Sequence, residues 1–218
     1  LLAPVIPRSK VIGIGKNYAD HALEMGGEAP STPLMFLVPN TAVVGPGDPV
    51  VMPPQTSEVS YEGELAVVIG RLCKDVEASE ALSAVFGYTV ANDVTARDLQ
   101  EKDGQWARAK GFDTFCPLGP CIVTADEIPN PNTLQIKTIV NGETLQDWNT
   151  NGMIFDVSTL IEFLSGSTTL LPGTVILTGT PHGVGMARKP PRWLQPGDSV
   201  TIEIEKIGKL TNPVVAEA

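Results

Sequence analysis

Short apolar runs, interrupted by proline and glycine, form the dominant pattern along this chain. Residues 10–15, 174–178 and 199–205 are rich in β-branched side chains and predict short strands. Residues 134–140 alternate between apolar and polar side chains, as a half-buried strand does. They lead into Asn141-Gly142, a dipeptide typical of hairpin turns, so a further strand is expected after it.

Three segments have the composition of helices. Residues 17–25 end at Gly26-Gly27, a C-terminal capping signal, and residues 155–164 show the clearest amphipathic period. Residues 77–85 predict a third helix between two strands, and residues 208–210 predict a turn. Strands thus outnumber helices and do not alternate with them regularly. This disfavours a doubly wound parallel sheet and predicts an α+β fold or a rolled sheet.

The composition indicates a folded protein and limits its partners. The chain has 218 residues, 42% of them hydrophobic and 18% charged, which is enough for one substantial domain or two small ones. A formal net charge of −10 argues against binding nucleic acid or an anionic membrane surface. No apolar stretch approaches the length of a membrane-spanning helix. Three cysteines without a second thiol pair predict reduced packing residues in a cytoplasmic protein, with a turn between Cys116 and Cys121.

Glu62 and Glu64 are the most informative residues of the sequence. They lie within residues 59–69, a β-branched run that predicts a strand, and alternate residues of a strand point to the same face. Two adjacent carboxylates raise each other's pKa, and a hard divalent cation such as Mg²⁺ or Mn²⁺ relieves their repulsion. Asp93, at the end of another apolar run, offers a third oxygen donor. The alternative is that one of the glutamates simply faces solvent at a strand edge.

The two histidines are candidates for proton transfer. His21 and Glu24 are three residues apart in the first predicted helix, so the carboxylate can orient the imidazole as a general base requires. An ordinary surface pair is the competing interpretation. His182 lies among small residues whose backbone N–H groups could approach an anion, or which form only a tight turn. Arg97 and Lys110 bring positive charge near the third carboxylate, although such charges often form a solvated face.

Taken together, these motifs resemble those of the fumarylacetoacetate hydrolase family. They appear in the family's order and cover nearly the whole chain. The matching segments are residues 15–21 with Glu24, 61–70, 92–100, 109–120, 177–181 and 208–213. The resemblance implies an α+β fold, a β-rich roll of mixed sheets with a few short helices, in a single catalytic domain over residues 1–218. Members often carry a small N-terminal segment, which we expect to be missing from this chain because it begins with Leu1.

The resemblance also implies roles for individual residues. It implies Mg²⁺ or Mn²⁺ binding by Glu62, Glu64 and Asp93, catalysis by His21, Glu24 and Lys110, and substrate contacts by Arg97, Gln100 and Thr180. The substrate would be a small 2-oxo acid, which can chelate the cation through its carboxylate and 2-oxo oxygens. Family members usually pair, so a homodimer is expected.

Several reactions share the enolate that such a site stabilises. The expected reaction is hydrolysis of a carbon–carbon bond in an acylpyruvate-type 2,4-dioxo acid, with His21 activating water and a metal-held pyruvate enolate as product. Isomerisation of 2-hydroxyhepta-2,4-diene-1,7-dioate and decarboxylation of oxaloacetate are the alternatives, because both form a similar enolate. The alternative of another class is a non-catalytic relative that binds a metal or a metabolite.

Two positions depart from the family pattern. Val38 stands where members commonly have a lysine, so recognition of an anionic group or closure of the family's mobile lid is expected to weaken. Thr174 stands where an aspartate is common, and we expect only an effect on a turn. The reversion Val38→Lys would separate an impaired protein from an enzyme adapted to its own substrate.

Overall fold

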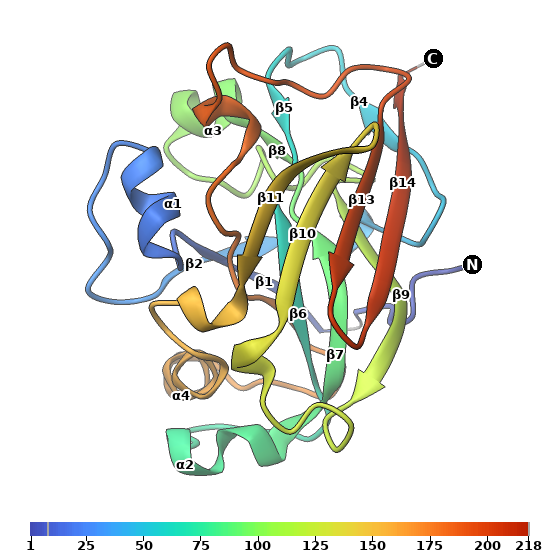
Figure 1. Ribbon diagram of the computed structural model, residues 1–218. Coiled ribbons are helices and arrows are strands. Elements are labelled where there is room, and N and C mark those ends of the chain that lie inside the picture. Colours follow the sequence, from blue (N-terminus) through green and yellow to red (C-terminus); the bar gives the residue numbers. More distant parts are fainter. Residues whose placement is uncertain (8, 218) are drawn as a thin grey trace.

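Two mixed β-sheets packed face to face form the body of the molecule in this computed structural model, which describes residues 1–7 and 9–217 (Figure 1). The strands are β1 (Val11–Gly15), β2 (Leu34–Val38), β3 (Val43–Val44), β4 (Val50–Met52), β5 (Val59–Ser60), β6 (Gly63–Ile69), β7 (Val85–Asn92), β8 (Thr95–Ala96), β9 (Cys116–Thr124), β10 (Gln135–Val140), β11 (Glu143–Asn149), β12 (Val175–Leu177), β13 (Ser199–Ile204) and β14 (Gly208–Ala216). The larger sheet has the order β2-β1-β12-β6-β7-β9-β3, and the smaller has the order β11-β10-β13-β14-β4. β5 and β8 pair separately.

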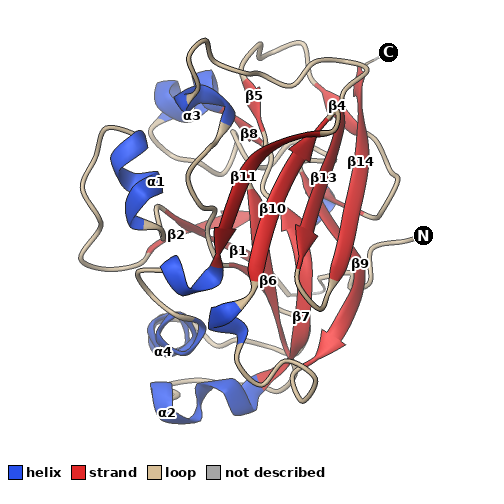
Figure 2. Ribbon diagram, in the orientation of Figure 1, coloured by secondary structure: helices blue, strands red, loops and turns tan. Residues whose placement is uncertain are grey.

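The helices are few and short, and they gather along one side of the two sheets (Figure 2). They are α1 (Ala19–Glu24), α2 (Ala78–Ala81), α3 (Arg97–Asp103) and α4 (Val157–Ser167), with 3₁₀ turns η1 (Asn40–Ala42), η2 (Leu82–Ala84), η3 (Pro131–Thr133), η4 (Thr150–Gly152) and η5 (Gly185–Ala187). The side chain of Asp156 caps α4 by accepting the N–H of Thr159 at 2.8 Å. This cap starts α4 two residues later than its apolar pattern predicts. The α+β fold with mixed sheets is confirmed.

Most predicted elements are present with small shifts. Asn141 and Gly142 adopt φ values of 51° and 86° and form the hairpin turn between β10 and β11, as expected. The helix predicted over residues 77–85 is divided into α2 and η2, and Val85 already belongs to β7. The prediction of a turn at residues 208–210 is wrong, because these residues belong to β14. The chain turns at residues 205–207 instead, where Lys206 has φ 65°, and Gly208 begins β14.

The segment around the last two cysteines also differs from its prediction. Residues 116–121 lie inside β9 rather than in a turn, because this segment pairs with β7 and β3. All three cysteines are free thiols, as expected. Cys73 and Cys116 are buried packing residues, but Cys121 is exposed.

The two sheets approach each other closely where β6 begins. Gly63 is buried there, and a Cβ at this position would clash with Oγ1 of Thr138 in β10 and lie 3.1 Å from Cγ2 of Ile202 in β13. Glycine is therefore required by the packing of the sheets. Since alternate residues of an extended chain face opposite ways, Glu62 and Glu64, on either side of Gly63, face away from the smaller sheet.

Candidate metal centre and active site

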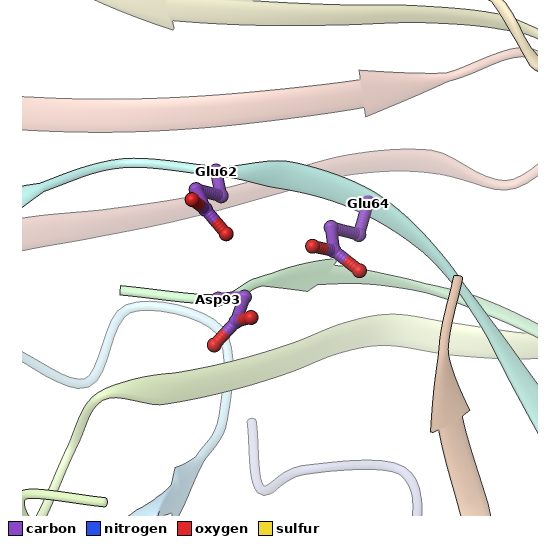
Figure 3. Close-up of side chains that lie close together, drawn as sticks. All are labelled: Glu62, Glu64 and Asp93. Carbon is purple, nitrogen blue, oxygen red and sulfur yellow. The ribbon is translucent and has the colours of Figure 1, made fainter. Parts of the chain in front are cut away.

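Three carboxylates converge where β6 starts and β7 ends (Figure 3). Glu62 immediately precedes β6, Glu64 is its second residue, and Asp93 immediately follows β7. The backbone N–H of Asp93 donates to the carbonyl oxygen of Glu62 at 2.9 Å, which continues the antiparallel pairing of the two strands. One oxygen from each side chain lies within 4.8 Å of the others, and all three residues are buried. The trio predicted from the sequence is thus assembled in one place.

Two cations neutralise part of this acidic cluster. The ammonium of Lys110 donates to Glu62 at 2.8 Å, to Asp93 at 2.6 Å and to a threonine hydroxyl at 2.8 Å. The guanidinium of Arg97 pairs with the other oxygen of Glu62. Both cations are buried. Three carboxylates against two cations leave one negative charge uncompensated when all groups are ionised.

Burial and charge act differently on the three carboxyl groups. Burial would raise the pKa of Glu62, but the charges of Arg97 and Lys110 outweigh it and hold that pKa at about 2. Burial raises the pKa of Asp93 to about 6, because Lys110 offsets burial only in part and Glu62 adds repulsion. Burial, together with the charges of Asp93 and Glu62, raises the pKa of Glu64 well above its ordinary range. The cluster would therefore gain from a further positive charge beside Glu64 and Asp93.

The donor set fits a divalent cation. Oδ1 of Asp93 is buried and has no hydrogen-bond partner within residues 1–7 and 9–217. Glu64 accepts a backbone N–H, from Gly179 at 2.7 Å. Carboxylate oxygens are the hard ligands that ions such as Mg²⁺ and Mn²⁺ prefer. Glu62, Glu64 and Asp93 could therefore hold a divalent metal ion.

His21 and Glu24 form a hydrogen-bonded pair on α1. Nδ1 of His21 lies 2.8 Å from Oε1 of Glu24, and the side chains are only 5% and 18% exposed, so this is not an ordinary surface pair. The Glu24 carboxylate also accepts the N–H of Gly183 at 2.8 Å. The small residues beside His182 therefore do approach an anion, namely Glu24. An ionised carboxylate only accepts hydrogen bonds, so Nδ1 carries the proton and Nε2 is left free to take one.

One pocket joins these groups. Its lining residues are Ile14, Gly15, Lys16, His21, Met25, Phe36, Glu62, Glu64, Asp93, Arg97, Gln100, Trp106, Lys110 and Thr180. They include every residue predicted to bind metal, to bind substrate or to act in catalysis, except Glu24, which contacts the pocket through His21. The apolar part of the wall includes Phe36 and Trp106, whose ring centroids are 5.5 Å apart.

The residues predicted to contact substrate are held by hydrogen bonds. Nη1 of Arg97 donates to Oε1 of Gln100 at 2.9 Å. The hydroxyl of Thr180 donates to the carbonyl oxygen of Gly63 at 3.0 Å and accepts from the amide of Gln146 at 2.9 Å. These contacts fix the side chains at the pocket wall, and their role toward a substrate stays a prediction.

Six residues of the pocket were not predicted from the sequence, among them Lys16, Phe36 and Trp106. Lys16 lies within the matching segment 15–21, but the sequence alone does not indicate that its side chain lines the pocket. The Phe36 ring lies over the ammonium of Lys110, whose Nζ is 5.0 Å from the ring centroid. The apolar run of residues 34–38, which forms β2, was the available signal for Phe36. Trp106 lies beyond α3, in a segment without a regular pattern.

The two departures from the family pattern have different surroundings. Val38 is buried on the same face of β2 as Phe36 and packs in a hydrophobic cluster, but it does not line the pocket. Thr174 closes the turn before β12, where its N–H donates to the carbonyl oxygen of Leu171 at 3.0 Å.

A buried acidic trio that could hold a divalent metal ion, a lysine, and a histidine hydrogen-bonded to a glutamate thus line one pocket. Residues 10–215 match the family described as fumarylacetoacetate (FAA) hydrolase C-terminal. Oxaloacetate tautomerase Fahd2a, mitochondrial, of Rattus norvegicus is 49% identical over 215 residues, which cover 98% of this chain and 69% of that protein. The chain belongs to the fumarylacetoacetate hydrolase family of enzymes.

Solved structures show the same relationship. The 5-carboxymethyl-2-hydroxymuconate delta-isomerase from Mycobacterium smegmatis is 54% identical with a TM-score of 0.89, covering 100% of this chain and 82% of that one. The fumarylacetoacetate hydrolase from Exiguobacterium antarcticum is 46% identical with a TM-score of 0.92, covering 100% and 78%. Within the described residues, no helix combines the length and the apolar character needed to cross a membrane.

Proposed function

We propose that this protein is a divalent-metal-dependent enzyme that moves a proton between oxygen and carbon in a 2-oxo acid, as an enol–keto tautomerase or isomerase. The observation that carries the proposal is the oriented imidazole of His21, which shares one buried pocket with three carboxylates able to hold a metal. Two relatives, 49% and 54% identical in sequence, carry the names of a tautomerase and an isomerase. They favour proton transfer over the carbon–carbon hydrolysis expected from the sequence.

The residues of the pocket divide the work of such a reaction. Mg²⁺ or Mn²⁺, held by the three carboxylates, would supply Lewis acidity toward the carboxylate and 2-oxygen of the substrate. From enol to ketone, the 2-hydroxyl loses a proton, C3 gains one, and the double bond moves from C2–C3 to C2–O. Nε2 of His21 would take the proton that the 2-hydroxyl loses and return it to C3, and Glu24 would balance the positive charge of the imidazolium. Phe36 and Trp106 keep water from part of the site.

Hydrolysis of an acylpyruvate is the second candidate. The free Nε2 of His21 could equally take a proton from a water molecule, and one structural neighbour is named as a fumarylacetoacetate hydrolase. Decarboxylation of oxaloacetate is favoured by no separate observation.

Metal-stripped protein, given back Mg²⁺ or Mn²⁺, would test the proposal on a panel of substrates. The panel holds enol-oxaloacetate, 2-hydroxyhepta-2,4-diene-1,7-dioate, acetylpyruvate and fumarylpyruvate. We expect metal-dependent loss of enol absorbance, incorporation of deuterium at carbon in D₂O, and no cleavage products by NMR. His21→Asn and Glu64→Gln should abolish this activity. Formation of pyruvate with a second acid would instead identify a hydrolase, and silence on the whole panel with metal bound would refute an enzyme of this type.

We also propose that the protein pairs with a second copy of itself. β2 is an edge strand of the larger sheet, and its Leu34, Met35 and Leu37 side chains are exposed. Exposed apolar edge strands are normally covered in natural proteins. Sedimentation velocity should show a dimer for the wild type and a monomer for Leu37→Glu, and a monomeric wild type at micromolar concentration would contradict the proposal.

A further inference from the structure

Lys16 is a cation of the pocket whose charge is not matched by an acidic side chain. The pocket is lined by three cationic residues: Lys16, Arg97 and Lys110. Arg97 pairs with Glu62, and the ammonium of Lys110 is shared between Glu62, Asp93 and a hydroxyl. Within residues 1–7 and 9–217, Lys16 makes neither an ion pair nor a side-chain hydrogen bond. Its charge is therefore available to a ligand.

The backbone of Lys16 is held in an unusual conformation. Its φ of 54° lies in the left-handed region, which residues other than glycine seldom adopt, and such residues cluster at functional sites. β1 ends at Gly15 on one side of it. On the other side, the amide of Asn17 donates to the carbonyl oxygens of Phe155 at 3.0 Å and Thr178 at 2.7 Å. The flanking structure thus fixes the direction in which the lysine leaves the chain.

The ammonium of Lys16 lies beside the turn that follows α1. Its Nζ is 3.2 Å from the position that a Cβ on Gly27 would take, so glycine leaves the lysine its room. Gly27 in turn closes the end of α1, since its N–H donates to the carbonyl oxygen of Ala22 at 3.0 Å. The free charge therefore lies between the strand that leads into the pocket and the helix that carries His21.

We propose that Lys16 binds the distal carboxylate of a dianionic 2-oxo acid and so selects dicarboxylates over monocarboxylates. The inference rests on the proposed function, because the 2-oxo end of the substrate must engage the three-carboxylate centre. A second carboxylate entering this acidic pocket needs a cation of its own, since an unpaired buried charge is costly. Arg97 and Lys110 are already committed to Glu62 and Asp93. A substrate with an uncharged tail gains nothing from Lys16.

The test compares two enols that differ in the charge of their tails: enol-oxaloacetate, with two carboxylates, and enol-phenylpyruvate, with one. Lys16→Met should raise KM for oxaloacetate about 10- to 100-fold, the loss expected when a hydrogen bond to a charged group is removed. The same variant should change kcat/KM for phenylpyruvate by less than about 3-fold. Lys16→Arg should restore most of the preference. Lys102→Met is the matched control, because Lys102 is exposed on α3 and does not line the pocket.

Two results would overturn the inference while leaving the proposed function intact. They are an equal loss on both substrates and an unchanged KM for oxaloacetate in Lys16→Met. If the wild type turns over neither these enols nor any other substrate of the panel above, the proposed function fails, and calorimetry then decides the inference separately. Mn²⁺-loaded wild type should bind 2-oxoglutarate about 10-fold or more tightly than 2-oxobutyrate, and Lys16→Met should lose that preference. A preference that persists in Lys16→Met, or is absent from the wild type, would overturn it.

Discussion

Replacing Glu64 by glutamine should stabilise the metal-free protein and at the same time remove most of its affinity for a divalent cation. Glutamine has the same shape, and its amide oxygen can still accept the N–H of Gly179, now 2.7 Å from the carboxylate. The substitution removes a negative charge that neither Lys110 nor Arg97 contacts. Fold stability and metal binding should therefore change in opposite directions.

The size of the effect follows from the spacing of the carboxylates. Their oxygens lie within 4.8 Å of one another, and two unit charges at that distance repel by about 3.5 kcal/mol at an effective dielectric constant of 20. Burial and this repulsion from Asp93 and Glu62 raise the pKa of Glu64 well above its ordinary range. A raised carboxyl pKa lowers stability as pH rises from the ordinary value through the raised one. With attraction from Lys110 as an offset, we expect Glu64→Gln to gain about 1–3 kcal/mol at pH 8 in chelator.

Urea unfolding at pH 8, with EDTA and with Mn²⁺, measures both effects. At 100 times its Kd, the ion should stabilise the wild type by about 2.7 kcal/mol, whereas a variant that binds 100-fold more weakly gains only about 0.4 kcal/mol. Glu101→Gln, at an exposed position of α3, controls for the loss of one negative charge. A Glu64→Gln variant that is less stable than the wild type in EDTA, or that gains as much from Mn²⁺, would refute this reasoning.

Three further predictions concern the same site. Glu24→Gln should lower kcat about 100-fold with little change in KM and shift the pH profile, because the amide no longer fixes the tautomer of His21; an unchanged pH profile would argue against a positioning role. Lys110→Met should cost about 3–5 kcal/mol in metal-free urea unfolding, because buried carboxylates lose their cation; a cost below about 1 kcal/mol would contradict this. Metal binding near pH 6 should release protons, because burial raises the pKa of Asp93 to about 6 and that of Glu64 well above its ordinary range; equal calorimetric heats in buffers of different ionisation enthalpy would count against it.

The acidic trio could be predicted because it depends on local geometry. Glu62 and Glu64 are alternate residues of one extended segment, and Asp93 immediately follows the next long strand along the chain. Strands that follow one another commonly pair, and an antiparallel pair brings the start of one beside the end of the other. Hydrophobic runs with their flanking residues were therefore sufficient to place all three carboxylates together.

Contacts between distant segments lay beyond such reasoning. The Glu24 carboxylate meets the N–H of Gly183, which is 159 positions away in the sequence. The place of Lys16 depends on its own φ and on the space left at Gly27, neither of which a pattern of apolar residues encodes. The incorrect prediction of a turn at residues 208–210 has a similar origin. Lys206 takes the left-handed conformation there, and Gly208, the more obvious turn residue, starts a strand.

The groups able to hold a metal and the groups able to move a proton are anchored in different parts of the molecule. The carboxylates lie at the ends of β6 and β7, in the middle of the larger sheet, whereas His21 and Glu24 lie on α1, a helix of only six residues. Changes in that short helix can therefore redirect the chemistry while the cation site is preserved. Such a division lets descendants of one ancestral fold diverge in reaction while inheriting the same ion-binding core.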